Sequence, residues 1–211
     1  GYTNQDESEH DFFKVGHTST SVSLACGLAK ARDLKHEHHN VIAVIGDGSL
    51  SGGEALEGFS NAAVLDSNII IVLNDNEMSI AENHGGLYNG LRTLRETNGT
   101  AECNMFKALG FDYYYVSDGN SLEQLVETLS KVKDTNKPTV VHIHTLKGKG
   151  YQPAEENKES WHWSVPFNLA DGSKKWDMSG ENINDMTYDY LCDKIKKDNS
   201  VVIVNAGTPG V

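Results

Sequence analysis

The sequence contains few cysteines, few cationic side chains and no long apolar run. Its three cysteines, Cys26, Cys103 and Cys192, are odd in number and far apart, which argues against a disulfide framework and against a CxxC metal or redox site; we expect free, buried thiols. No stretch approaches the roughly 20 consecutive apolar residues that a spanning helix needs, and no basic segment followed by an apolar run marks a signal peptide. These absences predict a cytoplasmic protein with no membrane partner.

Positive charge is scarce, because 18 Lys and Arg residues face 30 Asp and Glu residues and leave a net charge of -12. Such a charge repels nucleic acid and anionic membrane surfaces. We therefore expect neither as a partner, and an anionic ligand needs a local binding site. The phosphate-binding patterns GxGxxG and GxxxxGK(S/T) are also absent, which argues against a nucleotide-binding domain.

Apolar segments of two periodicities alternate along the chain. Continuous apolar or β-branched runs at 41–45, 69–73 and 139–145 are typical of strands buried on both faces of a parallel sheet. Apolar residues at helical spacing predict intervening helices, which cover about 18–31, 55–63 and 122–132. The alternation predicts an α/β fold with a doubly wound, mainly parallel sheet and helices on both faces.

The last third of the chain differs in character. Residues 151–180 show little periodicity but hold all three tryptophans, so we expect an ordered linker. A helix around 185–197 and an apolar run at 201–204, read as a strand, then open a new unit. The expected organisation is therefore a ligand-binding domain over 1–150, the linker, and the truncated start of a second domain over 181–211, with both ends of the sequence cut.

Polar turns close the first two predicted strands. The first turn is Gly46-Asp47-Gly48 and the second is Asn74-Asp75-Asn76. Because successive parallel strands end at the same edge of a sheet, Asp47 and Asn76 should converge there, and such hard oxygen ligands suit Mg²⁺ with a bound phosphate. The amides that begin the helix after Gly48-Ser49 add a second anion site. The alternative is that both triplets are only tight turns, where these residue types are common.

The two triplets together resemble the thiamine-diphosphate motif. Three longer segments, VLNDNEMSI at 72–80, GHTSTS at 16–21 and KGKGYQPAE at 147–155, are similar to the 1-deoxy-D-xylulose-5-phosphate synthases. The resemblance spans nearly the whole chain. It implies the thiamine-diphosphate-binding fold of the transketolase superfamily, with the N-terminal part of the family missing.

The resemblance also implies roles for individual residues. The metal ligands would be Asp47, Asn76 and the backbone carbonyl of Met78. The residues implied to bind the cofactor are Gly16, His17, Thr18, Gly48, Ser49, Asn76 and Tyr151. His17, Lys147 and His162 would act on substrate, although a solvent-facing loop histidine and a solvated lysine remain alternatives for the first two. His162 lies in WHWSVP at 161–166, which carries one more residue before the proline than the family pattern.

The implied reaction decarboxylates pyruvate and joins the two-carbon unit to D-glyceraldehyde 3-phosphate, which gives a precursor of isoprenoids and thiamine. The implied cofactors are thiamine diphosphate and Mg²⁺, and the implied assembly is a homodimer. In the family the glutamate that activates the cofactor lies in the next domain, so we expect residues 1–211 alone to be inactive. The alternatives are another transketolase-superfamily enzyme with a different donor or acceptor, and a degenerate, non-catalytic interaction domain.

Two departures from the family pattern and one histidine pair complete the sequence-based predictions. Between Ala81 and Asn104 the family has a longer segment, so either this is a short variant or residues are missing from the sequence. Asn120 stands where the family has histidine. His142 and His144 point to one side of a predicted strand, and we expect packed, hydrogen-bonded side chains there, not zinc ligands.

Overall fold

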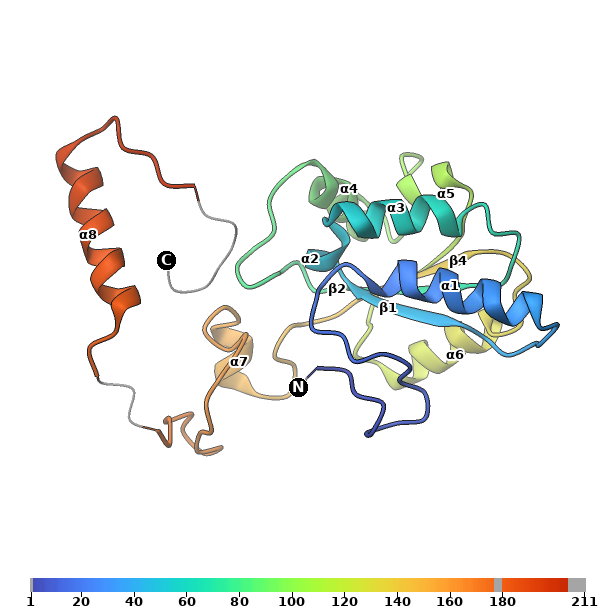
Figure 1. The fold of residues 1–211 in the computed structure, drawn as a ribbon, viewed down its shortest axis with the longest axis horizontal. Helices are drawn as coiled ribbons and strands as arrows, with labels where there is room; N and C mark the ends of the chain where they lie inside the picture. The colour runs from blue at the N-terminus through green and yellow to red at the C-terminus, as the bar shows by residue number, and fades with distance from the viewer. Residues whose placement is uncertain (1, 177–179, 205–211) are drawn as a thin grey trace. The chain divides into compact units, whose positions relative to one another are not determined.

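The computed structural model describes residues 2–176 and 180–204 (Figure 1). The chain divides into two compact units, Gly1–Lys149 and Gly150–Val211. The first unit holds every strand that the structure describes and the helices from α1 to α6. Among the described residues, no helix is both long and apolar enough to cross a membrane.

The first unit is built on a four-stranded parallel sheet in the order β1-β2-β4-β3. Its strands are β1 (Ile42–Gly46), β2 (Ile70–Asp75), β3 (Asp112–Val116) and β4 (Thr139–His144). The three strands predicted from apolar runs are confirmed. The expectation that each is buried on both faces is wrong for β1, because β1 lies at an edge of the sheet and its Ile42 and Val44 side chains are exposed. Sequence analysis missed β3, because its DYYYV sequence alternates exposed and less exposed positions at an edge of the sheet and contains no continuous apolar run.

Helices cover both faces of this sheet, as predicted. The helices of the first unit are α1 (Ser21–Leu34), α2 (Asp47–Leu50), α3 (Gly53–Ala62), α4 (Gly86–Glu96), α5 (Met105–Leu109) and α6 (Leu122–Val132). Side chains alternate along β2: Ile71 and Leu73 join the core with α1 and α3, whereas Ile70 joins the core with α6. Figure 1 shows α6 on the opposite side of the sheet from α3. The fold is therefore the predicted doubly wound α/β arrangement.

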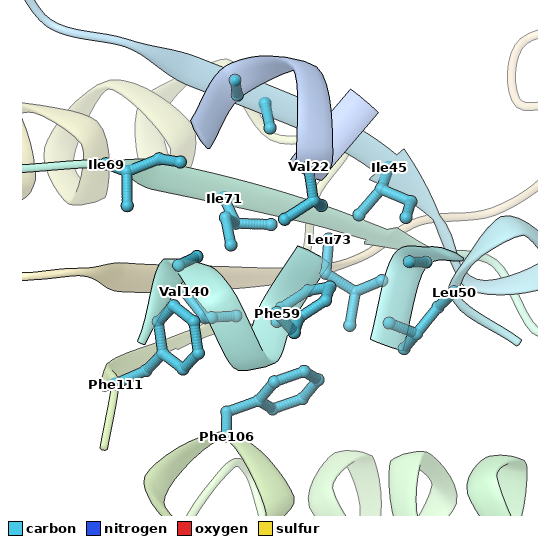
Figure 2. Packing of buried hydrophobic residues seen from close by; sticks show 14 of the residues in the cluster. Val22, Ile45, Leu50, Phe59, Ile69, Ile71, Leu73, Phe106, Phe111 and Val140 are labelled. Atoms are coloured by element: carbon cyan, nitrogen blue, oxygen red, sulfur yellow. The ribbon is translucent and has the colours of Figure 1, made fainter. Parts of the chain in front are cut away.

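The larger core is centred on Phe59 of α3, which is fully buried (Figure 2). Its ring centroid lies 5.6 Å from that of Phe106 and 5.7 Å from that of Phe111, in tilted and edge-on orientations that aromatic pairs favour. Phe106 belongs to α5, whose first turn is capped by the Asn104 side chain, which accepts hydrogen bonds from the amides of Phe106 and Lys107. These contacts fix the segment that follows α4 against the helices of this face.

The second unit contains α7 (Gln152–Glu156) and α8 (Ile183–Lys197). Trp161 packs edge-on against Tyr151 and Phe167, with ring centroids 5.2 and 4.7 Å away, so the tryptophan-containing segment is ordered around an aromatic cluster. The strand predicted at 201–204 is wrong. These residues form no strand, and no described strand pairs with them to supply the ladder hydrogen bonds that a strand requires.

The three thiols are free, as expected, but they are not buried. Cys103 is exposed, and Cys26 and Cys192 are half-buried. The prediction of buried thiols treated cysteine as a small apolar residue, whereas Cys103 lies in the polar connection between α4 and α5.

Candidate magnesium and diphosphate site

The tips of β1 and β2 meet at the same edge of the sheet. In the parallel register, Gly46 at the end of β1 pairs with Asn74 near the end of β2. Asp47 follows directly as the first residue of α2, and Asn76 follows two positions after Asn74. The expected convergence of the two polar turns is therefore present, whereas the assignment of Asp47, Asn76 and Met78 as ligands remains a prediction.

Asp47 is a buried carboxyl group that accepts a hydrogen bond from an uncharged side chain. It is 2% exposed, and its Oδ2 accepts a hydrogen bond of 2.8 Å from Nδ2 of Asn83. Burial, together with the neighbouring Asp75 carboxylate, raises the pKa of Asp47 to about 7. None of the ion pairs between described residues includes Asp47. A divalent cation would supply the missing positive charge, so the environment of Asp47 fits a metal ligand.

The segment after β2 presents neutral oxygen atoms. Oδ1 of Asn76 accepts from the amide of Met78 over 3.2 Å, and Met78 forms an isolated antiparallel bridge with Glu82. In the described residues, no group of three or more His, Cys, Asp or Glu side chains is placed to hold a metal. A site here would use one carboxylate, one amide oxygen and one backbone carbonyl, a hard donor set that suits Mg²⁺ completed by phosphate and water.

Sequence reasoning missed Asn83, which links this segment to Asp47. Besides its bond to Asp47, Asn83 accepts a hydrogen bond of 2.6 Å from Oγ of Ser79 through Oδ1. Ser79 packs so closely on Gly48 that a Cβ at Gly48 would overlap the Ser79 hydroxyl. The residues 76–83 therefore fold over the start of α2. No periodicity or spacing in the sequence marks Asn83.

A cavity of about 350 Å³ is lined by several of the residues that were predicted to bind the cofactor. Its lining includes His17, Thr18 and Ser49, together with Gly46 at the tip of β1. The hydroxyl of Ser19 donates to the carbonyl of Ser49 over 2.7 Å and ties the segment before α1 to α2. The metal-binding candidates are not part of this lining. The cavity therefore reaches the end of β1, next to Asp47, and the exposed residues His17 and Thr18 form part of its lining.

The helix expected after Gly48-Ser49 is in fact two helices. The four-residue α2 begins at Asp47 and contains both Gly48 and Ser49, and α3 begins at Gly53 after a short turn. The apolar stripe that predicted the helix starts at Ala55, so it identified only α3. The break lies at Gly52, which packs directly against the Ser19 side chain. A Cβ at this position would overlap that side chain.

The remaining predicted site residues lie outside the two polar turns and outside the cavity lining. Lys147 follows β4 at the same edge of the sheet, and its ammonium donates to the carbonyl of Ser79 over 2.5 Å. Tyr151 and His162 belong to the second unit. Tyr151 has a buried hydroxyl with no hydrogen-bond partner in the described chain. A buried hydroxyl of this kind is costly unless a ligand or water satisfies it, which agrees with a ligand-contacting role.

Buried polar groups lie beneath the site. Oδ2 of Asp75, which is fully buried, pairs with Nε2 of His142 at 2.9 Å and with Nη1 of Arg95 at 2.5 Å. Burial opposes the charge of Asp75, but the hydrogen bonds from His142 and Arg95 hold its pKa at about 2. His144 bonds to Glu77 over 3.0 Å. The expectation that both histidines are hydrogen-bonded is confirmed.

Comparisons with known proteins agree with this picture. The family model described as 1-deoxy-D-xylulose-5-phosphate synthase matches residues 1–104 and 95–145. The chain is 36% identical to the 1-deoxy-D-xylulose-5-phosphate synthase of Porphyromonas gingivalis, over 99% of this chain and 39% of that protein. It is 42% identical to the Listeria monocytogenes enzyme of the same name, over 82% of this chain and 30% of that protein.

The fold is similar to that of a solved enzyme. The transketolase of Campylobacter jejuni matches with a TM-score of 0.51 and 25% identity, over 67% of this chain and 21% of that chain. The alignment with the Porphyromonas relative runs over 252 positions, more than the 211 residues of this chain. That relative therefore has residues that this chain lacks, and the two family-model segments overlap at 95–104, inside the region where a longer segment was expected. The matched regions establish that this chain belongs to the 1-deoxy-D-xylulose-5-phosphate synthase family.

Proposed function

We propose that this chain is the metal- and diphosphate-binding part of a thiamine-diphosphate-dependent carboligase. The complete protein would decarboxylate pyruvate and join the two-carbon unit to D-glyceraldehyde 3-phosphate, which gives 1-deoxy-D-xylulose 5-phosphate for isoprenoid and thiamine synthesis. The observation that carries the proposal is the buried, uncompensated carboxyl of Asp47 beside the tip of β2. Because the chain spans only 39% of the Porphyromonas relative, the reaction is a proposal about the complete protein.

The metal would be held by this unit alone. The Asp47 carboxylate, the Asn76 amide oxygen and the Met78 carbonyl provide hard ligands for Mg²⁺. Gly48 and Ser49 lie in the first turn of α2, where backbone amides favour a phosphate. The cation and these amides together would hold a diphosphate against the repulsion of a chain with a net charge of -12.

Further residues would hold the organic part of the cofactor and the substrates. His17 and Thr18, which line the cavity beside β1, would contact thiamine diphosphate together with the adjacent Gly16. Tyr151 would contact the thiamine part of the cofactor. When bound, thiamine diphosphate supplies the carbanion chemistry that decarboxylation requires. His17, Lys147 and His162 would bind the charged groups of the substrates and exchange protons with them.

The proposed organisation follows the sequence-based predictions. Residues 1–150 would form the diphosphate-binding domain, 151–180 a linker and 181–211 the start of the pyrimidine-binding domain. The activating glutamate would come from that following domain, and the enzyme would be a cytoplasmic homodimer without a nucleic-acid or membrane partner. Residues 1–211 alone would then bind metal weakly and show no turnover.

Calorimetry and product analysis on the complete protein test the proposal. We expect thiamine diphosphate to bind only when Mg²⁺ is present, and Asp47→Asn to abolish that binding. Pyruvate and D-glyceraldehyde 3-phosphate should give 1-deoxy-D-xylulose 5-phosphate and CO₂. Cofactor binding with a different product would favour another enzyme of the superfamily, and no binding by the complete protein would favour a non-catalytic domain.

A further inference from the structure

Both neighbours of Asn76 are carboxylates that the same guanidinium group contacts. Nη1 of Arg95 lies 2.5 Å from Oδ2 of Asp75, and Nη2 lies 3.1 Å from Oε2 of Glu77. Arg95 comes from the last turn of α4, a helix that neither the motifs nor the apolar runs identified. One side chain therefore holds the backbone on each side of the predicted metal ligand.

Two histidines of β4 contact the same two carboxylates. His142 lies 2.9 Å from Asp75, and His144 lies 3.0 Å from Glu77. Asp75 and Glu77, the residues before and after Asn76, therefore both contact side chains of α4 and β4. The amide of Glu77 also donates to Oδ1 of Asp75 over 3.1 Å. Contacts to both sequence neighbours of Asn76 thus fix the turn.

The backbone conformation at Glu77 shows why the turn needs these contacts. Glu77 has a φ of +67°, a left-handed conformation that is unfavourable for a residue with a Cβ. Strain of this kind persists only where surrounding contacts hold it. Glu77 is 52% exposed at its side chain, so packing does not hold it, whereas Arg95, His144 and the hydrogen bond from the amide of Asn83 to the Glu77 carbonyl do.

We propose that Arg95 is a positioning residue for the metal site, which clamps Asp75 and Glu77 so that the Asn76 amide oxygen and the Met78 carbonyl face the cation. This inference rests on the proposed function. Arg95 does not touch the metal or the cofactor; it acts through the turn. Groups that orient metal ligands typically change metal affinity by about 10- to 100-fold when they are removed.

Metal affinity of the complete protein, measured with Mn²⁺ by electron paramagnetic resonance in the presence of thiamine diphosphate, tests this inference. Arg95→Met should weaken Mn²⁺ binding by about tenfold or more, and Arg95→Lys should recover part of the loss, because an ammonium can contact one carboxylate but cannot span both. Activity should show the same defect as a higher Mg²⁺ requirement, with kcat largely restored at saturating Mg²⁺.

A second variant avoids leaving the buried Asp75 without its partner. Glu77→Gly removes the outer contact and the backbone strain together, since glycine tolerates positive φ, and it should also weaken Mn²⁺ binding severalfold. Glu127→Gln is the matched control, because Glu127 forms an exposed ion pair of 2.6 Å with Lys131 on α6, and it should bind Mn²⁺ like the unmodified protein. Unchanged affinity in Glu77→Gly overturns the clamp. Failure of the unmodified protein to bind Mn²⁺ would instead overturn the proposed function.

Discussion

The side-chain amide of Asn83 donates a hydrogen bond of 2.8 Å to the Asp47 carboxylate, at the edge of the sheet where β1 ends. Asn83 is therefore an uncharged hydrogen-bond donor to Asp47, the buried carboxylate that we propose as a metal ligand. Through Ser79, the same side chain also braces the turn that contains Met78. The interaction makes Asn83 part of the site although it lies well outside the recognised motif.

Replacing Asn83 should weaken the metal site. Asn83→Ala leaves the Asp47 carboxylate without its amide donor and frees the turn at 76–83, so we expect Mg²⁺ affinity in the presence of thiamine diphosphate to fall by about tenfold. Calorimetry measures the change. Asn89→Ala on α4 is the control, because the Asn89 side chain is exposed; equal affinities in the two variants would contradict the role of Asn83.

Metal binding should depend on pH through Asp47. Its pKa of about 7 in the metal-free protein means that the group is mostly protonated below pH 7 and must lose that proton when a cation binds. Affinity should therefore be nearly constant above about pH 8 and fall by about tenfold per pH unit well below 7. Calorimetry in buffers of different ionisation enthalpy should detect close to one proton released at pH 6. No proton release at that pH would show that Asp47 is already ionised or does not bind the metal.

Asp75 should make protein stability depend on pH over a much lower range. Its folded pKa of about 2 lies below the ordinary value of 3.8, so its contribution to the free energy of unfolding is present above about pH 4 and is lost as the pH falls through 2. Asp75→Asn removes a partner from partly buried Arg95 and from buried His142 and should cost roughly 3 kcal/mol at pH 7. Denaturant unfolding should show this difference shrinking toward pH 2, and a constant difference would contradict the assignment.

Gly48 should tolerate no side chain while Ser79 is present. A Cβ at Gly48 would overlap Oγ of Ser79 and lie 3.0 Å from its Cβ, so Gly48→Ala should push the 76–83 segment away from α2 and weaken metal binding. The double variant Gly48→Ala with Ser79→Gly removes both contacts and should recover much of the affinity. Gly53→Ala, where a Cβ meets nothing within 4 Å, should be neutral or slightly stabilising. A Gly48→Ala protein with normal metal affinity would contradict the close packing.

Most of the first unit could be predicted because its buried strands carry a simple signal. The run before Asp47 and the run before Asn76 are apolar throughout, which is typical of strands in a parallel sheet, and the turns that close them stand out as polar. The edge at which both strands end follows from their parallel orientation in a βαβ unit. The amino-acid pattern alone therefore predicts that the two turns meet at neighbouring strand tips, and the register of β1 with β2 confirms it.

What could not be predicted depends on contacts between distant segments. Arg95 and Asn83 look like ordinary polar residues in the sequence, and only the packing of α4 and of the preceding turn brings them to Asp75 and Asp47. The tyrosine-rich β3 is a strand because β4 pairs with it. The run at 201–204 shows the converse, because strand-like residues form no strand without a neighbouring strand.

The central claim is that Asp47 and Asn76 bind one divalent cation that in turn holds a diphosphate. A crystal structure of the complete protein grown with Mn²⁺ and thiamine diphosphate, with anomalous data collected near the manganese edge, tests it most directly. We predict one anomalous peak in contact with the Asp47 carboxylate, the Asn76 amide oxygen and the diphosphate. Bound cofactor with its manganese ion held by other residues, and with Asp47 still bonded to Asn83 and not to the ion, would contradict the account.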